Sequence, residues 1–416
     1  MSGETEKRKS AYDVLADRGF VSQVTDEPAV RSLLDNGVCT FYAGFDPTGR
    51  SLHIGHLVPL YAMAHLARAG HNAIALVGGA TAQIGDPSGK TEMRKILSTE
   101  EIDANAEAMG RQIRGFLQSV NADARVVNNA QWLRGLNYIE FLRDIGRHFS
   151  VNRMLSFETY KMRLETGLSF IEFNYQLLQS YDYLTLHRDR GVNLQLGGDD
   201  QWGNIVAGID LIRRIEGTEV QGITFPLVTR ADGNKMGKSE KGAVFLDAEL
   251  YSPYEFFQYW RNVPDPDVAR FLKLYTFLDL KEIEALTSVS GSALNAAKER
   301  LAWELTNIVH GAEKADEMLE AARAAFGGGG ESTEKIPSTT VAASEIEEGL
   351  GVVDAFVRAG LCASKGEARR LIRQGGARIN DQRVSDEDQS LAMAASGERE
   401  LMLRAGKKRY HRIVIE

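Results

Sequence analysis

The sequence predicts an α/β protein: a Rossmann-like domain with a parallel sheet, then a helical domain and a small α+β domain. A strand–helix–strand pattern occupies residues 38–79, and a second strand-to-helix junction spans 192–216. A glycine-rich segment, 327–338, precedes a short basic tail. A chain of 416 residues is also too long to fold around one ordinary hydrophobic core, which favours two or three domains.

The first junction begins with "VCTFYAG" (38–44), a short strand rich in β-branched and aromatic residues. A turn follows at Pro47 and Gly49. From Ile54 the apolar residues recur with helical spacing until Gly70, and "NAIALVGG" (72–79) is a buried-type strand. The tetrapeptide HIGH (53–56) therefore lies at a helix N-terminus beyond the carboxyl end of a strand, where open α/β sheets bind ligands.

The second junction runs from the strand Val192–Leu196 through a Gly-Gly turn into the helix "QWGNIVAGIDLIRRI" (201–215). Between the junctions, "SFIEFNYQLLQSYDYL" (169–184) also has helical spacing. Tyr175, Gln179 and Asp182 share one face of it. That face is either its solvent side or a ligand-binding surface.

Beyond residue 247 the chain reads as consecutive helices to 326, a flexible linker and two short helices with a turn. We expect domains at 1–247, 248–326 and 346–416, with the linker at 327–345. The last 66 residues carry 13 Lys and Arg against 9 Asp and Glu, although the whole chain has a net charge of −8. A basic tail on an acidic body is typical of a nucleic-acid-binding module.

The composition, 43% hydrophobic and 25% charged, is that of a soluble globular protein. Apolar stretches fall short of the roughly 20 residues that span a bilayer, and the polar first ten residues contain no signal for secretion. We therefore expect a cytoplasmic protein without membrane contact. Cys39 and Cys362 stand far apart, which argues against a disulfide framework or a cysteine metal site.

His53 and His56 could hold a metal, pack in a core or bind an anion. Zinc needs three or four protein ligands, and no third candidate is close in sequence. Their polar, turn-rich surroundings weaken the core interpretation. A helix N-terminus offers free N–H groups and the positive end of a dipole, so we favour phosphate or nucleotide binding. Gly55 between them lets a flat base approach the backbone.

A basic loop, "TRADGNKMGKSEKGAV" (229–244), contains Lys235, Lys238 and Lys241. By itself it could be a solvated surface loop. Beside a nucleotide site, mobile lysines would supply the cations that a leaving pyrophosphate requires.

"HIGH" followed by "KMGKS" (235–239) resembles the paired signature of class I aminoacyl-tRNA synthetases. Four further motifs, in family order, resemble those of bacterial-type tyrosyl-tRNA synthetases: "YAGFDPT", "GGATAQIGDPSGK", "NYQLLQSYD" and "GGDDQWGN". The tail around "SKGEARRLIRQGG" resembles an RNA-binding module of a ribosomal protein. One departure is Gly237, where the wider class usually has serine.

The resemblance implies activation of L-tyrosine by ATP and transfer of the tyrosyl group to the 3′ end of tRNA-Tyr, with Mg²⁺ accompanying ATP, no protein-bound metal and a homodimeric assembly. It assigns the catalytic, phosphate-side contacts to His53, His56, Thr48, Lys90, Arg94, Lys235, Lys238 and Ser239. It assigns ATP binding to Gly44, Asp46, Gly55, Gly198, Asp200, Gln201 and Lys238. It assigns the tyrosine pocket to Tyr42, Asp86, Asn129, Tyr175, Gln179, Asp182 and Gln195.

Two alternatives remain open. A tryptophanyl-type synthetase would have the same fold and chemistry, although an acid that reads a phenol, such as Asp182, suits tyrosine better. A non-catalytic RNA-binding protein derived from a synthetase could lose either signature motif, and both are intact here.

Overall fold

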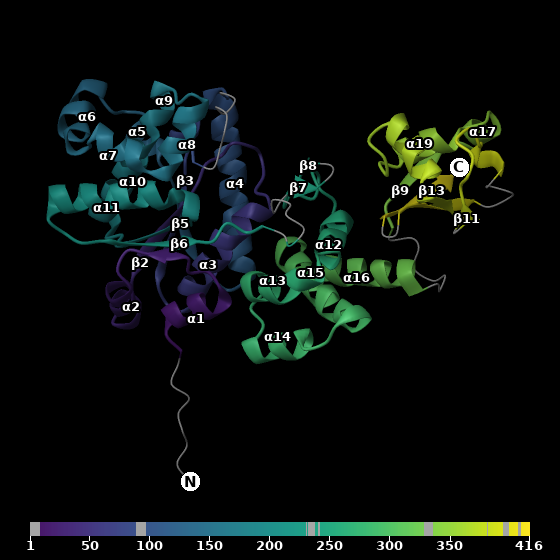
Figure 1. Ribbon diagram of the computed structural model, residues 1–416, viewed down its shortest axis with the longest axis horizontal. Helices are drawn as coiled ribbons and strands as arrows, with labels where there is room; N and C mark the ends of the chain where they lie inside the picture. Colours follow the sequence, from purple (N-terminus) through teal and green to yellow (C-terminus); the bar gives the residue numbers. More distant parts are fainter. Residues whose placement is uncertain are drawn as a thin grey trace, which may run out of the picture. The chain divides into compact units, whose positions relative to one another are not determined.

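The computed structural model describes residues 9–88, 97–229, 231, 238–239, 242–327, 336–380, 382–393, 399–406 and 409–416. The chain divides into two compact units (Figure 1). The first comprises Met1–Tyr251 and Arg261–Val309, and the second comprises Ser252–Trp260 and His310–Glu416.

A six-stranded sheet forms the centre of the first unit. Its strands, in spatial order, are β1 (Gln23–Val24), β6 (Gln221–Phe225), β5 (Leu194–Gly198), β2 (Thr40–Phe45), β3 (Asn72–Val77) and β4 (Ala124–Asn128). All neighbours are parallel except β1 with β6. The predicted strands and the Rossmann-like class are therefore confirmed. The strand order reverses between β2 and β5, where such sheets open a crevice for ligands.

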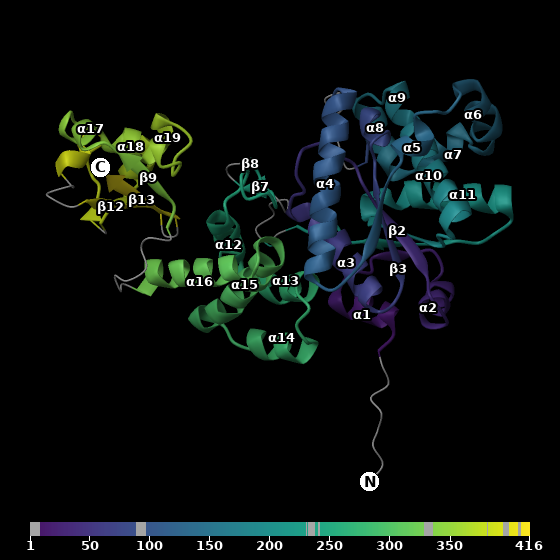
Figure 2. The same cartoon turned by 180° about the vertical axis from the view of Figure 1, so that it is seen from behind.

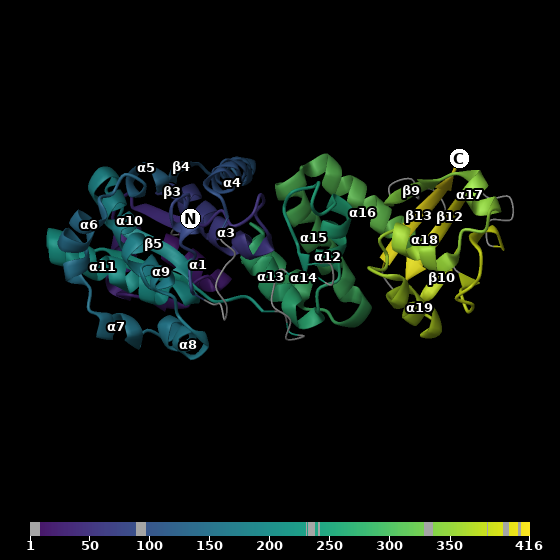
Figure 3. The ribbon, with the colours of Figure 1, turned by 90° about the horizontal axis from the view of Figure 1, so that it is seen from above.

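Parallel strands need crossover connections, which are usually right-handed, and helices form these connections here. The 3-10 turn η1 (Ile54–His56) and α3 (Leu57–Arg68) join β2 to β3, and α4 (Thr99–Ser119) lies between β3 and β4. Helix α11 (Trp202–Glu216) joins β5 to β6 and lies beside α10 (Tyr175–Arg190) (Figures 1 and 3). Leu57, Leu60, Tyr61 and Ala64 are fully buried, which confirms the apolar face predicted for α3.

The segment between β4 and β5 contains six helices: α5 (Ala130–Leu133), α6 (Tyr138–Asp144), α7 (Val151–Ser156), α8 (Glu158–Thr166), α9 (Phe170–Phe173) and α10. The helix predicted across 169–184 is interrupted at Asn174, whose side-chain amide donates to the Phe170 carbonyl at 2.7 Å. Tyr175 and Asp182 are 6% and 2% exposed, so their side of α10 does not face solvent.

The helices predicted beyond residue 247 are present, but they do not form one compact domain. They are α12 (Pro253–Arg261), α13 (Val268–Tyr275), α14 (Leu280–Thr287), α15 (Asn295–His310) and α16 (Ala312–Gly327). Packing assigns α13, α14 and most of α15 to the first unit, whereas α12 and α16 belong largely to the second. Arg18 of α1 (Ala11–Arg18) fastens the end of α13 to the first unit, because it donates to the carbonyls of Lys273, Thr276 and Leu278.

A five-stranded sheet organises the rest of the second unit, in the order β11 (Gln382–Arg383), β10 (Ala377–Ile379), β12 (Glu400–Ala405), β13 (Arg409–Ile415) and β9 (Ser338–Val341). Helices α17 (Ala343–Glu347), α18 (Val352–Arg358) and α19 (Lys365–Arg373) lie over it (Figure 2). Within the segment expected to be a linker (327–345), β9 pairs in parallel with β13, and α17 begins at residue 343. Residues 328–335 of the linker lie outside the described residues.

No helix in the described part of the chain is long and apolar enough to cross a membrane.

Replacing Arg18 by Met should destabilise the first unit. The side chain is 8% exposed and makes hydrogen bonds of 2.6 to 3.1 Å to three carbonyls. Methionine preserves the apolar stem but leaves those carbonyls without their donor, which should lower the free energy of unfolding by about 3 kcal/mol. Urea-induced unfolding measures this loss. Arg111→Met is the control, since that arginine makes an exposed ion pair with Glu107 and should change stability by less than about 0.5 kcal/mol.

Candidate active site

The predicted site residues meet at the carboxyl edge of the first sheet. Asp46 follows β2, Gly78 follows β3, Asn129 follows β4 and Asp200 follows β5. Parallel strands end at the same edge of a sheet, so side chains far apart in the sequence come together there. Gly44 occupies an exposed position in β2, and Thr48 is exposed in the following turn, where its N–H donates to the Asp46 carbonyl at 2.8 Å.

The HIGH sequence forms a turn closed by its own imidazoles. Gly55 N–H donates to His53 Nδ1, and His53 N–H donates to His56 Nδ1, each at 3.1 Å. Since Nδ1 is the acceptor in both rings, each neutral ring carries its proton on Nε2 and is a donor there. A Cβ at Gly55 would lie 2.8 Å from His53 Cε1, so only glycine allows this fold-back.

This turn is hydrogen-bonded to the extended segment Val244–Leu246, which follows β8. Ile54 N–H donates to the Val244 carbonyl at 3.0 Å, and Leu246 N–H donates to the Leu52 carbonyl at 2.9 Å. His53 and Phe245 form an antiparallel bridge between them. The HIGH turn is therefore joined through the backbone to the segment that begins five residues after the KMGKS motif.

Part of the predicted phosphate-binding set is not described. Lys90, Arg94 and Lys235 lie outside the described residues. Lys238 and Ser239 are described through their backbone, as strand β7 (Lys238–Ser239), which pairs with β8 (Gly242–Ala243). That hairpin ends immediately before Val244.

A buried carboxylate lies in the predicted tyrosine pocket. Asp182 is 2% exposed, and it accepts hydrogen bonds from Trp132 Nε1 at 2.7 Å and Asn129 Nδ2 at 2.9 Å. Burial raises its pKa to about 7, against the lowering effect of the two donors. Trp132 was absent from our sequence prediction. Its position on the helical turn after Asn129 was the available signal.

Two buried polar atoms in this pocket have no hydrogen-bond partner among the described residues. They are the Tyr42 hydroxyl and Gln195 Oε1. Tyr42 and Gln195 stand opposite each other on β2 and β5, and both are at most 3% exposed. Burial, and then the charge of Asp182, raise the pKa of Tyr42, which therefore stays a neutral donor. A polar ligand in this pocket would satisfy the hydrogen-bonding capacity of both atoms.

A hydrogen-bonded chain connects Asp182 to the end of β2. Asn129 Nδ2 also donates to Thr81 Oγ1 at 3.0 Å, and Thr81 donates to Asp46 Oδ1 at 2.8 Å. The Tyr175 hydroxyl donates to Asp46 Oδ2 at 2.8 Å. Asp46, which we expected with ATP, thus contacts the predicted tyrosine pocket. Thr81 was not predicted from the sequence.

A second chain of contacts joins the residues predicted to hold the ammonium group and the ribose. Gln201 Nε2 donates to Asp86 Oδ2 at 2.7 Å, and Asn204 Nδ2 donates to both Gln201 Oε1 at 3.1 Å and Gln179 Oε1 at 3.0 Å. Burial, and then the charge of Asp86, raise the pKa of Asp200. At Gly198 a Cβ would lie 2.5 Å from Asp200 Oδ1, so any larger residue there would clash with that carboxylate in its present position.

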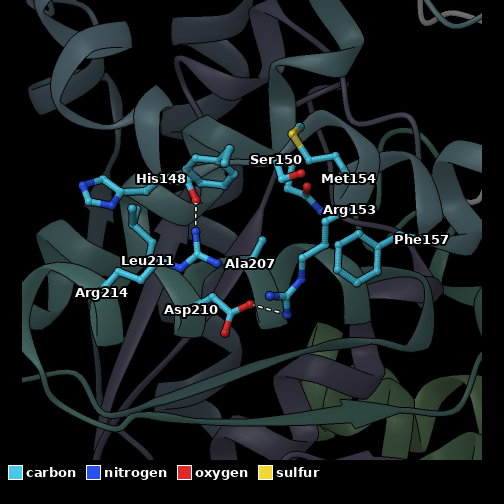
Figure 4. Close-up of a pocket in the computed structure, with 11 residues that line it drawn as sticks. His148, Ser150, Arg153, Met154, Phe157, Ala207, Asp210, Leu211 and Arg214 are labelled. Carbon is cyan, nitrogen blue, oxygen red and sulfur yellow. Dashed lines mark hydrogen bonds and ion pairs between the residues drawn. The ribbon is translucent and has the colours of Figure 1, made fainter.

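A small cavity elsewhere in the unit contains none of the predicted site residues. It lies between α7 and α11, where Arg153 pairs with Asp210 and Arg214 donates to the His148 carbonyl (Figure 4). Its volume of about 30 Å³ suits water rather than a nucleotide. Among the described residues, no three His, Cys, Asp or Glu side chains are grouped to hold a metal ion.

The sequence and the fold have counterparts in known proteins. The family model for class I tRNA synthetases (W and Y) matches residues 34–327, and one for the tyrosine–tRNA ligase SYY-like C-terminal domain matches 330–413. The chain belongs to the class I tRNA synthetases for tryptophan and tyrosine. Within that family it is similar in sequence to tyrosine–tRNA ligases, at 51% to 56% identity over nearly its full length.

The chain is 56% identical to the tyrosine–tRNA ligase of Treponema denticola, over 97% of this chain and 99% of that protein. It is 51% identical to that of Acetivibrio thermocellus, again over 97% and 99%. A C-terminally truncated mitochondrial tyrosyl-tRNA synthetase of Aspergillus nidulans has a similar structure, with a TM-score of 0.71 and 29% identity over 77% of this chain and 95% of that one. A tryptophanyl-tRNA synthetase of Encephalitozoon cuniculi, 14% identical, has a similar fold, with a TM-score of 0.54 over 74% of this chain and 87% of that one.

Tyrosine affinity should depend on pH through Asp182. If the ionised carboxylate is the stronger acceptor for the substrate hydroxyl, the dissociation constant should fall roughly tenfold between about pH 6 and about pH 8. Isothermal titration of tyrosine measures it, and Asp182→Asn should abolish the dependence. A flat profile in the unsubstituted protein would contradict this role.

The raised pKa also means that the contribution of Asp182 to stability is complete below its usual pKa of 3.8 and is lost as pH rises through about 7.

Proposed function

We propose that this crevice activates L-tyrosine with ATP, forms tyrosyl-adenylate and transfers the tyrosyl group to the 3′ end of tRNA-Tyr. The observation that carries the proposal is the unsatisfied Tyr42 hydroxyl in the same pocket as the buried Asp182 carboxylate. A phenolic hydroxyl can donate to Asp182 and accept from Tyr42 at once. An indole N–H can only donate, so the pair favours tyrosine over tryptophan.

Tyr175, Asp86 and Gln179 would bind the substrate's ammonium group, because phenolic, carboxylate and amide oxygens all accept hydrogen bonds from it. Asn129 and Gln195 would line the pocket. Asp200 would accept the ribose hydroxyls, and Gln201, which is hydrogen-bonded to Asp86, would stand near the reacting carboxylate. These assignments place the substrate carboxylate between the two hydrogen-bonded chains.

Activation itself needs no protein nucleophile. The tyrosine carboxylate attacks the α-phosphorus, and pyrophosphate leaves, so the protein contributes positioning and charge stabilisation. The Nε2–H groups of His53 and His56 would donate to phosphate oxygens as charge develops. Lys90, Arg94, Lys235, Lys238 and Ser239 would hold the pyrophosphate, with Mg²⁺ arriving bound to ATP rather than held by the protein.

The second unit supplies the proposed tRNA contact. Arg369, Arg370 and Arg373 are exposed on α19, in the segment of net positive charge at the end of the chain. Glu387 pairs with Arg373 and lies 3.8 Å from Arg369, so it holds two of these guanidinium groups in place. Phosphates of tRNA would bind such a surface in a salt-dependent way.

We also propose that the protein is a homodimer that acts in the cytoplasm. Helices α6 to α9 lie at one end of the first unit (Figures 1 and 2), and they expose large apolar side chains: Tyr138, Ile139, Val151, Met162, Leu164, Phe170 and Ile171. Phe170 and Ile139 are 71% and 70% exposed, which is unfavourable for large apolar side chains unless a partner covers them. A second copy of the chain is the partner that the family resemblance implies.

Exchange of pyrophosphate into ATP, measured with each of the twenty amino acids, tests the proposed function. Tyrosine should support exchange strongly. Tryptophan-dependent exchange would favour the tryptophanyl alternative, and no exchange with any amino acid would favour a non-catalytic RNA-binding protein.

His53→Ala and His56→Ala should slow adenylate formation about a hundredfold, or about 3 kcal/mol, because each removes a donor whose contact strengthens in the transition state. Single-turnover kinetics measure the rate, and tyrosine affinity should remain nearly unchanged. Loss of the folded state, or of a bound metal, would instead identify the histidines as structural or ligating.

Tyr42→Phe should reduce the preference for tyrosine over phenylalanine about tenfold, near 1 kcal/mol, since it removes one neutral hydrogen bond to the substrate hydroxyl. The measurement is the ratio of kcat/KM for the two amino acids in pyrophosphate exchange. An unaltered ratio would show that Tyr42 does not read the hydroxyl.

A further inference from the structure

Helix α4 holds the turn before the HIGH sequence through two side-chain amides. Asn105 and Gln112 are seven residues apart, so they lie on the same side of α4. Asn105 Nδ2 donates to the Pro47 carbonyl at 3.3 Å, and Gln112 Oε1 accepts the Leu52 N–H at 2.8 Å. The helix therefore contacts both ends of the turn that leads from β2 to His53.

The Gln112 contact closes a small ring of hydrogen bonds. Gln112 Nε2 donates to Ser51 Oγ at 3.1 Å, and the Ser51 hydroxyl donates to the Leu52 carbonyl at 2.7 Å. That carbonyl also accepts the N–H of Leu246. Ser51 and Leu52 are buried, at 4% and 0% exposure, so water does not readily replace these bonds.

Residues 51–52 are thus held from two sides. Gln112 binds them from α4, which begins at Thr99, shortly after the segment that contains Lys90 and Arg94. The segment Val244–Leu246, which follows β8, binds Leu52 and Ile54 from the other side. Helix α4 and the segment Val244–Leu246 therefore both contact the dipeptide directly before His53.

We propose that Gln112 is a positioning residue for amino-acid activation. It fixes the backbone of Ser51 and Leu52, and through them the orientation of the His53 and His56 rings. This role rests on the proposed assignment of the two histidines to ATP. Within the described part of the chain, the side-chain hydrogen bonds of Gln112 go to Ser51 and Leu52, so tyrosine binding does not depend on it.

Gln112→Leu removes both amide contacts at similar length. The single-turnover rate of adenylate formation should fall about tenfold, while the dissociation constant for tyrosine changes by less than about twofold. Gln112→Glu keeps the acceptor for the Leu52 N–H and loses the donor to Ser51 Oγ, but the Ser51 hydroxyl can turn to donate to the new carboxylate. This variant should restore the rate to within about threefold. Gln118→Leu is the matched control, since Gln118 is an exposed glutamine of the same helix, and it should leave the rate unchanged.

A double variant that combines Gln112→Leu with His53→Ala separates a positioning role from a general loss of stability. If Gln112 acts through His53, adding Gln112→Leu to His53→Ala should lower the rate by much less than tenfold. Full additivity would overturn the proposal, as would a loss confined to tyrosine affinity. Ser51→Ala, which removes the other end of the Nε2 contact without altering α4, should give a smaller loss of the same kind if Gln112→Leu fails to fold, and no loss would also overturn the proposal.

The two assignments can fail separately. An impaired His53→Ala beside an unchanged Gln112→Leu would refute the role of Gln112 alone. An unchanged His53→Ala would refute the histidine assignment, and with it this role for Gln112.

Discussion

The parallel pairing of β2 with β5 is the constraint on which the first unit depends. It sets Tyr42 opposite Gln195 although more than 150 residues separate them along the chain. The chain then continues to opposite sides of the sheet from these two strands, which opens the crevice between them. Asp46 and Asp200 follow the ends of β2 and β5 at the same edge of the sheet, so both carboxylates lie on the same side of the predicted pocket.

Polar groups in the crevice fall into two classes with different energetic roles. Asp182, Asn129, Thr81 and Asp46 satisfy one another, and such a network holds one geometry because every change breaks a buried hydrogen bond. The Tyr42 hydroxyl and Gln195 Oε1 are buried without partners in the described structure, at about 1–3 kcal/mol each. A ligand that satisfies them binds more tightly, because the desolvation cost of both groups is already part of the free energy of folding.

Much of this could be predicted from the sequence, because strand and helix periodicities are local. The β2–α3–β3 unit and the shared face of Tyr175 and Asp182 follow from spacing within a dozen residues. Trp132 and Gln112 could not be found this way. Their roles depend on which distant atoms they meet, and neither residue stands out by type. Strand β9, in the segment expected to be a linker, was not predicted for a related reason: it pairs with β13, which is distant in the sequence.

The backbone pairing of Leu52–Ile54 with Val244–Leu246 has a consequence for insertions and deletions. Side chains alternate between the two faces of a strand, so shifting a paired register by one residue reverses every side chain in it. A one-residue change in length between Ser239 and Val244 would therefore either turn Phe245 to the other face of this pairing or break its bridge with His53. The spacing between the KMGKS motif and this bridge is thus a constraint on the proposed active site, as much as the residues of either motif. A sequence that keeps both motifs but alters this spacing would lose the geometry that both serve.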